Sequence, residues 1–154
     1  MMSWVIRPFQ DQDITGCLAN LRSNQPEYFA DYEYEEFSDD LSHRQTLSEA
    51  RQWPYFVLHC GDQVLANGGY FIRNDGFAVL IWGMVRRDLH HRGYGTVLLD
   101  YRLRHLIGKA AGIEIDTTPA SFPFYQKLGF QQEQTIRDGY APGLDKVIAK
   151  RLLP

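Results

Sequence analysis

The feature that most constrains this chain is a glycine-containing turn between an apolar strand and an amphipathic helix. Residues 77–85 form a nearly continuous apolar run, and Gly93 and Gly95 follow it just before a helical pattern. The first turn of a helix carries unpaired N–H groups and a partial positive charge. Glycine lets an anion approach these amides closely because it has no side chain. The pattern therefore indicates a phosphate-binding turn, with purely geometric turn glycines as the alternative.

Two common phosphate motifs do not fit this turn. A P-loop requires Gly-Lys-Ser/Thr, whereas Gly95 is followed by Thr96 and Val97. A dinucleotide fingerprint requires a third glycine at the position of Leu98. The turn therefore belongs to neither the P-loop nor the dinucleotide-binding class.

Hydrophobic periodicity predicts strands and helices along the whole chain of 154 residues, which we expect to form a single domain, residues 1–154. Two helices are expected between the first and second strands, a third with Leu99, Leu103, Leu106 and Ile107 on its apolar face, and a fourth over 119–128. The expected order is β-α-α-β-β-β-α-β-α-β-β. The expected strands are 3–7, 55–60, 63–73, 77–85, 113–117, 130–137 and 146–153.

Composition excludes several partners. The net charge of −3 argues against a broad nucleic-acid surface. No stretch approaches the roughly 20 apolar residues of a membrane helix, and the N-terminus lacks the layout of a signal peptide. We therefore expect a cytoplasmic protein with no nucleic-acid or membrane partner. Cys17 and Cys60 lie in apolar patterns and are expected to be buried thiols.

Two segments, residues 84–99 (MVRRDLHHRGYGTVLL) and residues 117–130, resemble motifs of the GNAT superfamily of acetyltransferases. The first resembles its central cofactor motif, Gln/Arg-x-x-Gly-x-Gly/Ala, with His90 at the Gln/Arg position and Arg87 where proline is common. Residues 117–130, TTPASFPFYQKLGF, resemble its second signature, which ends in Tyr-x-x-Leu-Gly-Phe. Two motifs in the right order and on the right elements are far more specific than either alone.

The resemblance implies an α+β fold with a twisted, mostly antiparallel sheet that splays between its fourth and fifth strands. It also implies acetyl-CoA as acyl donor, with no metal. Pantetheine would lie in the splay, bonded to backbone near Val85, and the amides of residues 91–96 would hold the pyrophosphate. The implied cofactor-binding residues are Met84, Val85, His90, His91, Arg92, Gly93, Tyr94, Gly95, Thr96, Thr117 and Phe124.

By the same resemblance, Tyr125 is the general acid that protonates the leaving thiolate. A phenol with a pKa near ~10 is a sensible proton donor to a thiolate whose conjugate acid has a pKa near ~8–9. The alternative is that Tyr125 is a core aromatic beside Phe122, Phe124 and Phe130.

The general base stays open at this point. Glu114 or Asp116, His59, a carboxylate from residues 31–40 acting through water, or ordered water alone could accept the proton. Residues 31–40 hold six carboxylates and could attract a cationic amine, or could form a solvated helix face. His90, His91 and His105 lack the usual spacing of metal ligands.

The leading hypothesis is an N-acetyltransferase in which a primary amine of a small molecule or peptide, which could be cationic, attacks acetyl-CoA directly. The alternatives are a non-catalytic acyl-CoA-binding sensor or scaffold and an interaction domain without a cofactor. Acceptor pockets of one fold vary with its loops, so the sequence leaves the acceptor open. It also leaves open whether the chain forms a homodimer.

Overall fold

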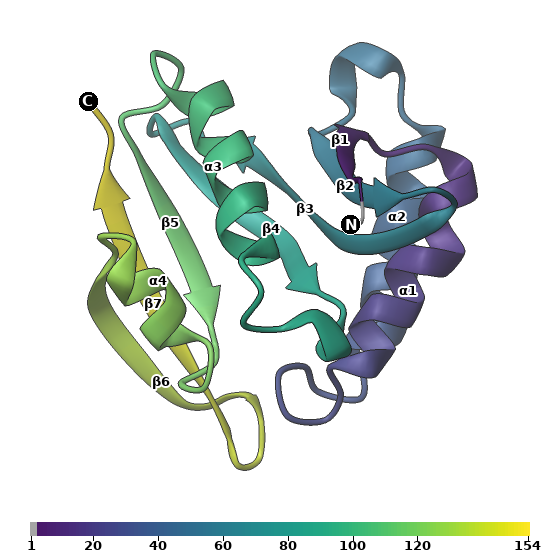
Figure 1. Ribbon diagram of the computed structural model, residues 1–154. Helices are drawn as coiled ribbons and strands as arrows, with labels where there is room; N and C mark the ends of the chain where they lie inside the picture. Colours follow the sequence, from purple (N-terminus) through teal and green to yellow (C-terminus); the bar gives the residue numbers. More distant parts are fainter. Residues whose placement is uncertain (1–2) are drawn as a thin grey trace.

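The computed structural model describes residues 3–154 and shows a mixed sheet in the order β1-β2-β3-β4-β5-β7-β6, with helices on both faces (Figure 1). The element order matches the predicted one, with three short 3₁₀ turns added. The strands are β1 (Val5–Pro8), β2 (Tyr55–Cys60), β3 (Gln63–Ile72), β4 (Phe77–Val85), β5 (Gly112–Thr117), β6 (Gln131–Ala141) and β7 (Leu144–Leu152). The helices are α1 (Ile14–Ser23), α2 (Glu33–Thr46), α3 (Tyr94–Leu106) and α4 (Phe122–Lys127).

The core consists of two hydrophobic clusters, one on each face of the sheet. Successive side chains of a strand point to opposite faces. Accordingly, Phe56 and Leu58 of β2 join the cluster that includes α3, whereas Tyr55 and Val57 join the cluster that includes α1 and α2. Because both faces of β2 are covered, its sequence is almost uninterruptedly apolar.

The sheet splays between β4 and β5, as predicted. Their parallel pairing covers only Phe77 to Val79 on β4 and Gly112 to Glu114 on β5. Beyond this point β4 runs on to Val85, while β5 stays paired with β7 along its whole length. The two ribbons diverge toward the lower part of Figure 1, where the turn before α3 lies. The remaining strand pairs are antiparallel.

A buried hydrogen-bond network fixes a bulge in β4 beside the splay. The register with β3 shifts between Asn67 and Gly69, and Trp82 adopts a left-handed φ of 46°. Tyr55 Oη donates to the Trp82 carbonyl over 2.7 Å and accepts from Asn67 Nδ2 over 2.8 Å. Asn67 Oδ1 in turn accepts from Asn20 Nδ2 over 2.9 Å. A bulge redirects the backbone locally, and here α1, β2 and β3 all hold its geometry.

The structure corrects several details of the predicted elements. The fourth helix begins at Phe122 rather than at Pro119, because residues 118–121 form a turn closed by the Thr118 carbonyl. The β6–β7 hairpin is longer than predicted and closes at Pro142 and Gly143. Ile107 lies past the end of α3 and is 51% exposed.

Leu99 and Leu106 of α3 are buried as predicted, and Leu98 and Arg102 are buried beside them. Cys17 is buried as predicted, whereas Cys60 is only half-buried. None of the helices between residues 3 and 154 is long and apolar enough to cross a membrane.

Candidate active site

The glycine turn presents unpaired backbone amides at the start of α3. His91 and Gly93 both adopt left-handed φ values, of 64° and 88°, which turn the chain into the helix. The first helical hydrogen bond runs from Val97 N to the Gly93 carbonyl over 3.1 Å. The N–H groups of residues 94–96 therefore lack acceptors within the helix, as at any helix start. Arg92 is exposed beside them, and left-handed backbone at a non-glycine residue is typical of functional sites.

The end of β4 turns one backbone edge toward the splay. Arg86 N donates to the Leu65 carbonyl over 2.9 Å, so the adjoining Val85 N–H and carbonyl point away from β3. The Val85 carbonyl accepts from Asn24 Nδ2 over 2.9 Å and lies 2.9 Å from His90 Nε2. Asn24 Oδ1 is a buried polar atom without a partner among residues 3–154.

The second sequence motif lies directly against the first. A Cβ atom on Gly95 would lie 3.2 Å from Phe124 Cζ and 3.6 Å from Val85 Cγ2. Glycine at position 95 therefore allows α3, α4 and the end of β4 to meet. Next to Phe124, the ring of Tyr125 packs edge-on against Phe124 and Phe130, with ring centroids 5.0 and 5.5 Å away.

Comparisons with known proteins agree with this geometry. The family model of the acetyltransferase (GNAT) domain matches residues 51–132, just over half of the chain. The chain belongs to the GNAT family of acetyltransferases. A search of curated proteins finds no match.

Solved structures of GNAT acetyltransferases share the fold over nearly the whole chain. A structure from Desulfovibrio desulfuricans assigned to the GNAT family superposes with a TM-score of 0.85 at 18% identity, covering 99% of this chain and 100% of the other. The ribosomal-protein-S18-alanine N-acetyltransferase of Escherichia coli gives 0.77 at 17% identity, covering 98% and 94%. An N-acetyltransferase from Staphylococcus aureus gives 0.79 at 18% identity, covering 99% of both chains.

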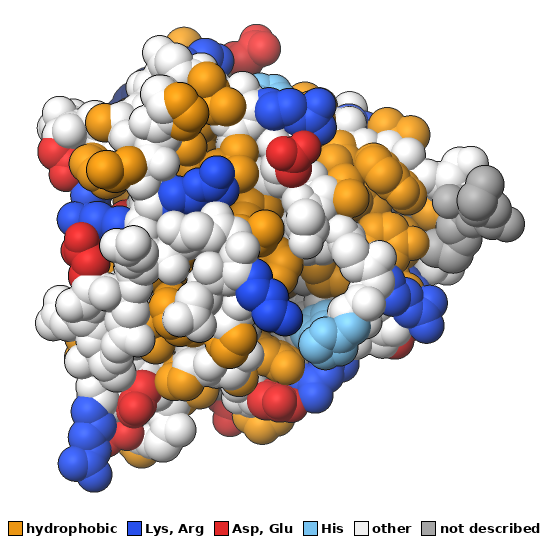
Figure 2. Space-filling view, turned by 60° about the vertical axis from the view of Figure 1, so that its left-hand side comes forward, with side chains coloured by type: hydrophobic (Ala, Val, Ile, Leu, Met, Phe, Trp, Pro, Cys, Tyr) orange, Lys and Arg blue, Asp and Glu red, His pale blue; other side chains and the backbone are white. Residues whose placement is uncertain are grey.

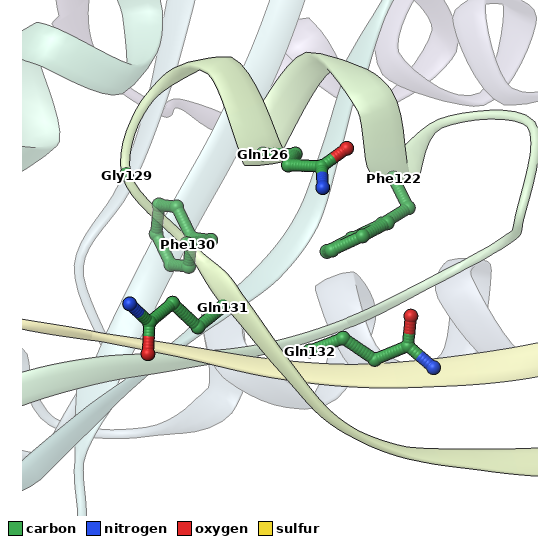
Figure 3. Close-up of a pocket in the computed structure, with 6 residues that line it drawn as sticks. All are labelled: Phe122, Gln126, Gly129, Phe130, Gln131 and Gln132. Atoms are coloured by element: carbon green, nitrogen blue, oxygen red, sulfur yellow. The ribbon is translucent and has the colours of Figure 1, made fainter.

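A groove of about 520 Å³ runs between α3 and the end of α4, and Gly93, Thr96 and Arg151 contribute to its lining. Figure 2 shows this side of the molecule, where basic side chains adjoin a histidine near the lower edge. A second hollow of about 380 Å³ lies between α4 and the start of β6 (Figure 3). None of the predicted site residues lines this second hollow. The groove between α3 and α4, which Gly93 and Thr96 line, is the one next to the glycine turn.

Most of the predicted cofactor residues lie together at the glycine turn, whereas Met84 and Thr117 lie apart from it. Residues 90–96 form the turn and the first helical turn, and Val85, Gly95 and Phe124 meet at its inner side. Met84 is buried with its side chain in the cluster under α1 and α2. Thr117 ends β5 opposite Val147 of β7, across the splay from β4.

The Tyr125 side chain is half-buried and packs against the cluster under α3. Its partial removal from water raises the pKa of the phenol above its ordinary value, an effect that the Arg102 guanidinium opposes and the Asp116 carboxylate reinforces. The phenol therefore stays protonated at neutral pH, as a general acid must. The charges of Arg102 on α3 and of Asp116 on β5 thus both act on this phenol.

Acidic and aromatic groups gather on the other side of the splay. Tyr140 Oη of β6 donates to Asp116 Oδ1 of β5 over 3.0 Å, and burial near Asp116, Glu33 and Tyr125 raises the Tyr140 pKa. Glu33, at the start of α2, is 7% exposed, and its Oε2 accepts from Ala30 N over 2.7 Å. Burial is the largest cause that raises the Glu33 pKa to about 7.

The other sequence candidates for the base have different surroundings. Glu114 forms ion pairs with Arg73 at 2.6 Å and Lys150 at 3.8 Å, and it faces Val79 where β4 and β5 are still paired. His59 lies on β2, two strands beyond β4, with Nδ1 2.9 Å from the Gly61 carbonyl. Of these candidates, Asp116 lies on β5 beyond the part that is paired with β4, and Glu33 at the start of α2 acts electrostatically on its partner Tyr140.

The histidines do not converge. The ring of His90 packs on Tyr28 and lies against the Val85 carbonyl, whereas His105 lies near the end of α3 against Tyr101 and Phe56. Among residues 3–154 there is no group of three His, Cys, Asp or Glu side chains that could hold a metal ion.

Proposed function

We propose that this chain is an acetyl-CoA-dependent N-acetyltransferase that moves an acetyl group to a primary amine by direct attack. The close approach of Gly95 to Phe124 and Val85 carries the proposal. It supports a site in which the unpaired helix amides, the open backbone edge of β4 and the Tyr125 phenol, next to Phe124 on α4, act together. These are the groups that a phosphate, an amide-containing arm and a departing sulfur require.

The residues present fit acetyl-CoA as the donor. The N–H groups of residues 94–96 and the exposed Arg92 suit a pyrophosphate, since the free N–H groups and the partial positive charge of a helix start attract anions. The unpaired Asn24 Oδ1 and the outward-facing Val85 N–H offer an acceptor and a donor near the β4 edge, which suits the amide groups of pantetheine. When bound, acetyl-CoA supplies the activated thioester.

We assign Tyr125 as the general acid. The amine nitrogen attacks the thioester carbonyl carbon, the C–N bond forms, and the C–S bond breaks with its electron pair moving to sulfur. Tyr125 donates its proton to this sulfur and regains one from water. Since burial keeps the phenol protonated, it is available as a donor throughout the neutral pH range.

We assign Glu33 as the proton acceptor for the incoming amine. Its pKa of about 7 allows a large fraction of carboxylate at neutral pH while keeping it basic enough to take a proton. One oxygen is held by the Ala30 N–H, which leaves the other for the amine or a bridging water. Glu33, Asp116 and Tyr140 together favour a cationic amine, carried by a small molecule or a peptide.

The proposal is tested with the purified protein, acetyl-CoA and a broad panel of amines. We expect acetyl-CoA to raise the melting temperature and at least one amine to cause coenzyme A release. Tyr125→Phe should lower kcat by about 10²–10³-fold, the usual contribution of a general acid, and leave acetyl-CoA binding intact. Tyr101→Phe, which removes a hydroxyl from α3, is the matched control and should keep full turnover.

Three outcomes would contradict parts of this proposal. Full turnover of Tyr125→Phe across pH would show that the acid is another group. A melting temperature that does not respond to saturating acetyl-CoA would favour an interaction domain without this cofactor. Binding without turnover over the whole panel would favour a sensor or scaffold.

A further inference from the structure

Arg102 is a buried cation without a carboxylate partner. It lies in the middle of α3 and is 3% exposed, and no Asp or Glu among residues 3–154 forms a salt bridge with it. Its polar contacts are long, from Nε to the Leu98 carbonyl at 3.4 Å and from Nη1 to the Gly69 carbonyl at 3.3 Å. Buried charges are normally paired, since burial alone disfavours them strongly. Protein stability therefore does not explain why an arginine is buried at this position.

Two glycines make room for the guanidinium. A Cβ atom on Gly68 of β3 would lie 2.9 Å from Arg102 Nη1, and one on Gly83 of β4 would lie 3.2 Å from it. Both positions adjoin the β4 bulge at Trp82. The two neighbouring strands thus lack side chains where the guanidinium lies, and the sheet is shaped around the charge.

The guanidinium lies near the proposed chemistry. Arg102 follows Gly95 by about two helical turns, so both residues lie on the same side of α3. Gly95 approaches Phe124 closely, and Tyr125 next to Phe124 packs against the same cluster as Leu98 and Leu106 of α3. The charge of Arg102 acts on the Tyr125 phenol. The other titratable groups that act on this pair are Tyr55, whose ring lies in the cluster on the other face of the sheet, and the exposed Asp116 of β5.

We propose that Arg102 is a positioning residue that provides the positive charge allowing the half-buried Tyr125 to give its proton to the departing sulfur. This inference rests on the proposed function. When Tyr125 donates its proton, a negative charge remains on its oxygen until water returns a proton. Because Arg102 is buried and fixed, its charge is screened less by water than an exposed cation and stabilises the negative charge on the phenol oxygen more strongly. Arg102 itself stays protonated throughout.

The test is a double-mutant cycle on kcat with acetyl-CoA and an active amine. Arg102→Met should lower kcat by about 10–100-fold while KM for acetyl-CoA changes by less than about threefold. In the Tyr125→Phe background the same substitution should change kcat by less than about threefold, because the proton transfer that it assists has already been lost. Arg102→Lys, which keeps a cation, should recover most of the rate.

Protein stability separates this role from a structural one. Replacing a buried ion with an apolar side chain of similar length is often neutral or stabilising, so Arg102→Met should keep the melting temperature and acetyl-CoA binding of the wild type. Arg104→Met, on the exposed side of the same helix, should leave both rate and stability unchanged. The proposal is wrong if Arg102→Met lowers kcat by the same factor in the wild type and in Tyr125→Phe. It is also wrong if Arg102→Lys does not recover activity. A normal rate in Tyr125→Phe would instead contradict the acid assignment.

Discussion

The two sides of the splay are built in different ways. The proposed donor half, residues 84–96 and 117–130, uses backbone amides, glycines and the Tyr125 phenol on two consecutive motifs. The proposed acceptor half, residues 31–46 and 131–147, uses side chains such as Glu33 and Tyr140 that lie more than a hundred residues apart. A site built from backbone amides requires its glycines at fixed spacing, so it can be recognised in a sequence. A pocket of distant side chains becomes visible only once the chain is folded.

The comparison predicts that substitutions in the acceptor half change the kinetics with the amine, whereas substitutions in the donor half change the binding of acetyl-CoA. The largest effect is expected for Glu33→Gln, which should lower kcat/KM for the amine by about 10²–10³-fold because the proton acceptor is lost. The wild-type rate should rise with pH through about 7, where Glu33 loses its proton, and this limb should be absent in the variant. Rates are measured between pH 5.5 and 9, and acetyl-CoA affinity by calorimetry.

Glu35→Gln is the matched control, because Glu35 lies on the same helix and is exposed. It should preserve both the rate and the pH limb. If Glu33→Gln instead weakened acetyl-CoA binding and left the pH limb in place, Glu33 would belong to the donor half and the division would fail.

A smaller effect is expected for Gly95→Val in the donor half. Even a Cβ at this position would lie 3.2 Å from Phe124, so the larger side chain must push α4 away from the helix start. We expect the Kd for acetyl-CoA to rise about 30-fold, equivalent to about 2 kcal/mol, with every amine affected equally. Arg104→Val introduces the same β-branched residue on the exposed side of α3 and should leave Kd unchanged. An amine-dependent effect of Gly95→Val would argue against the division.

The sequence predicted the order of elements and the splay because both follow from strong local patterns. Apolar runs, turn residues and two motifs define β2 to β5 and the start of α3, whereas the start of α4 was predicted three residues too early. It placed Leu99, Leu103 and Leu106 correctly on the inner face of α3, but it wrongly included Ile107 and did not predict the buried Arg102, since arginine is rarely buried. The guanidinium fits there because Gly68 and Gly83, on strands 19 or more residues earlier, leave space for it.

The acceptor side was harder for a related reason. Glu33 is one of six carboxylates in residues 31–40, and nothing local distinguishes it from its neighbours. Its burial depends on how α2 packs on the sheet through Phe37 and Leu41, one and two turns further along the helix. Tyr140 lies in the hairpin where left-handed residues disturb the strand pattern, and its partner Asp116 belongs to another strand.

The smallest effect should appear in stability, and it tests whether Glu33 is buried as the division requires. Its pKa rises from 4.5 to about 7 on folding, so the folded protein binds more protons than the unfolded chain between these values. The favourable contribution of the protonated carboxyl is complete below pH 4.5 and is lost as pH rises through 7. The wild type should therefore lose stability relative to Glu33→Gln between pH 5 and pH 8.

Solvent screening near the opening reduces this loss to on the order of 1 kcal/mol. Urea unfolding of both proteins at pH 5 and pH 8 measures the difference. Other titrating groups are common to both proteins and cancel, and the glutamine still accepts the Ala30 N–H. A constant difference between the two proteins across pH would mean that solvent reaches Glu33 freely. The acceptor half would then be an open acidic surface, and the proton would leave the amine through water.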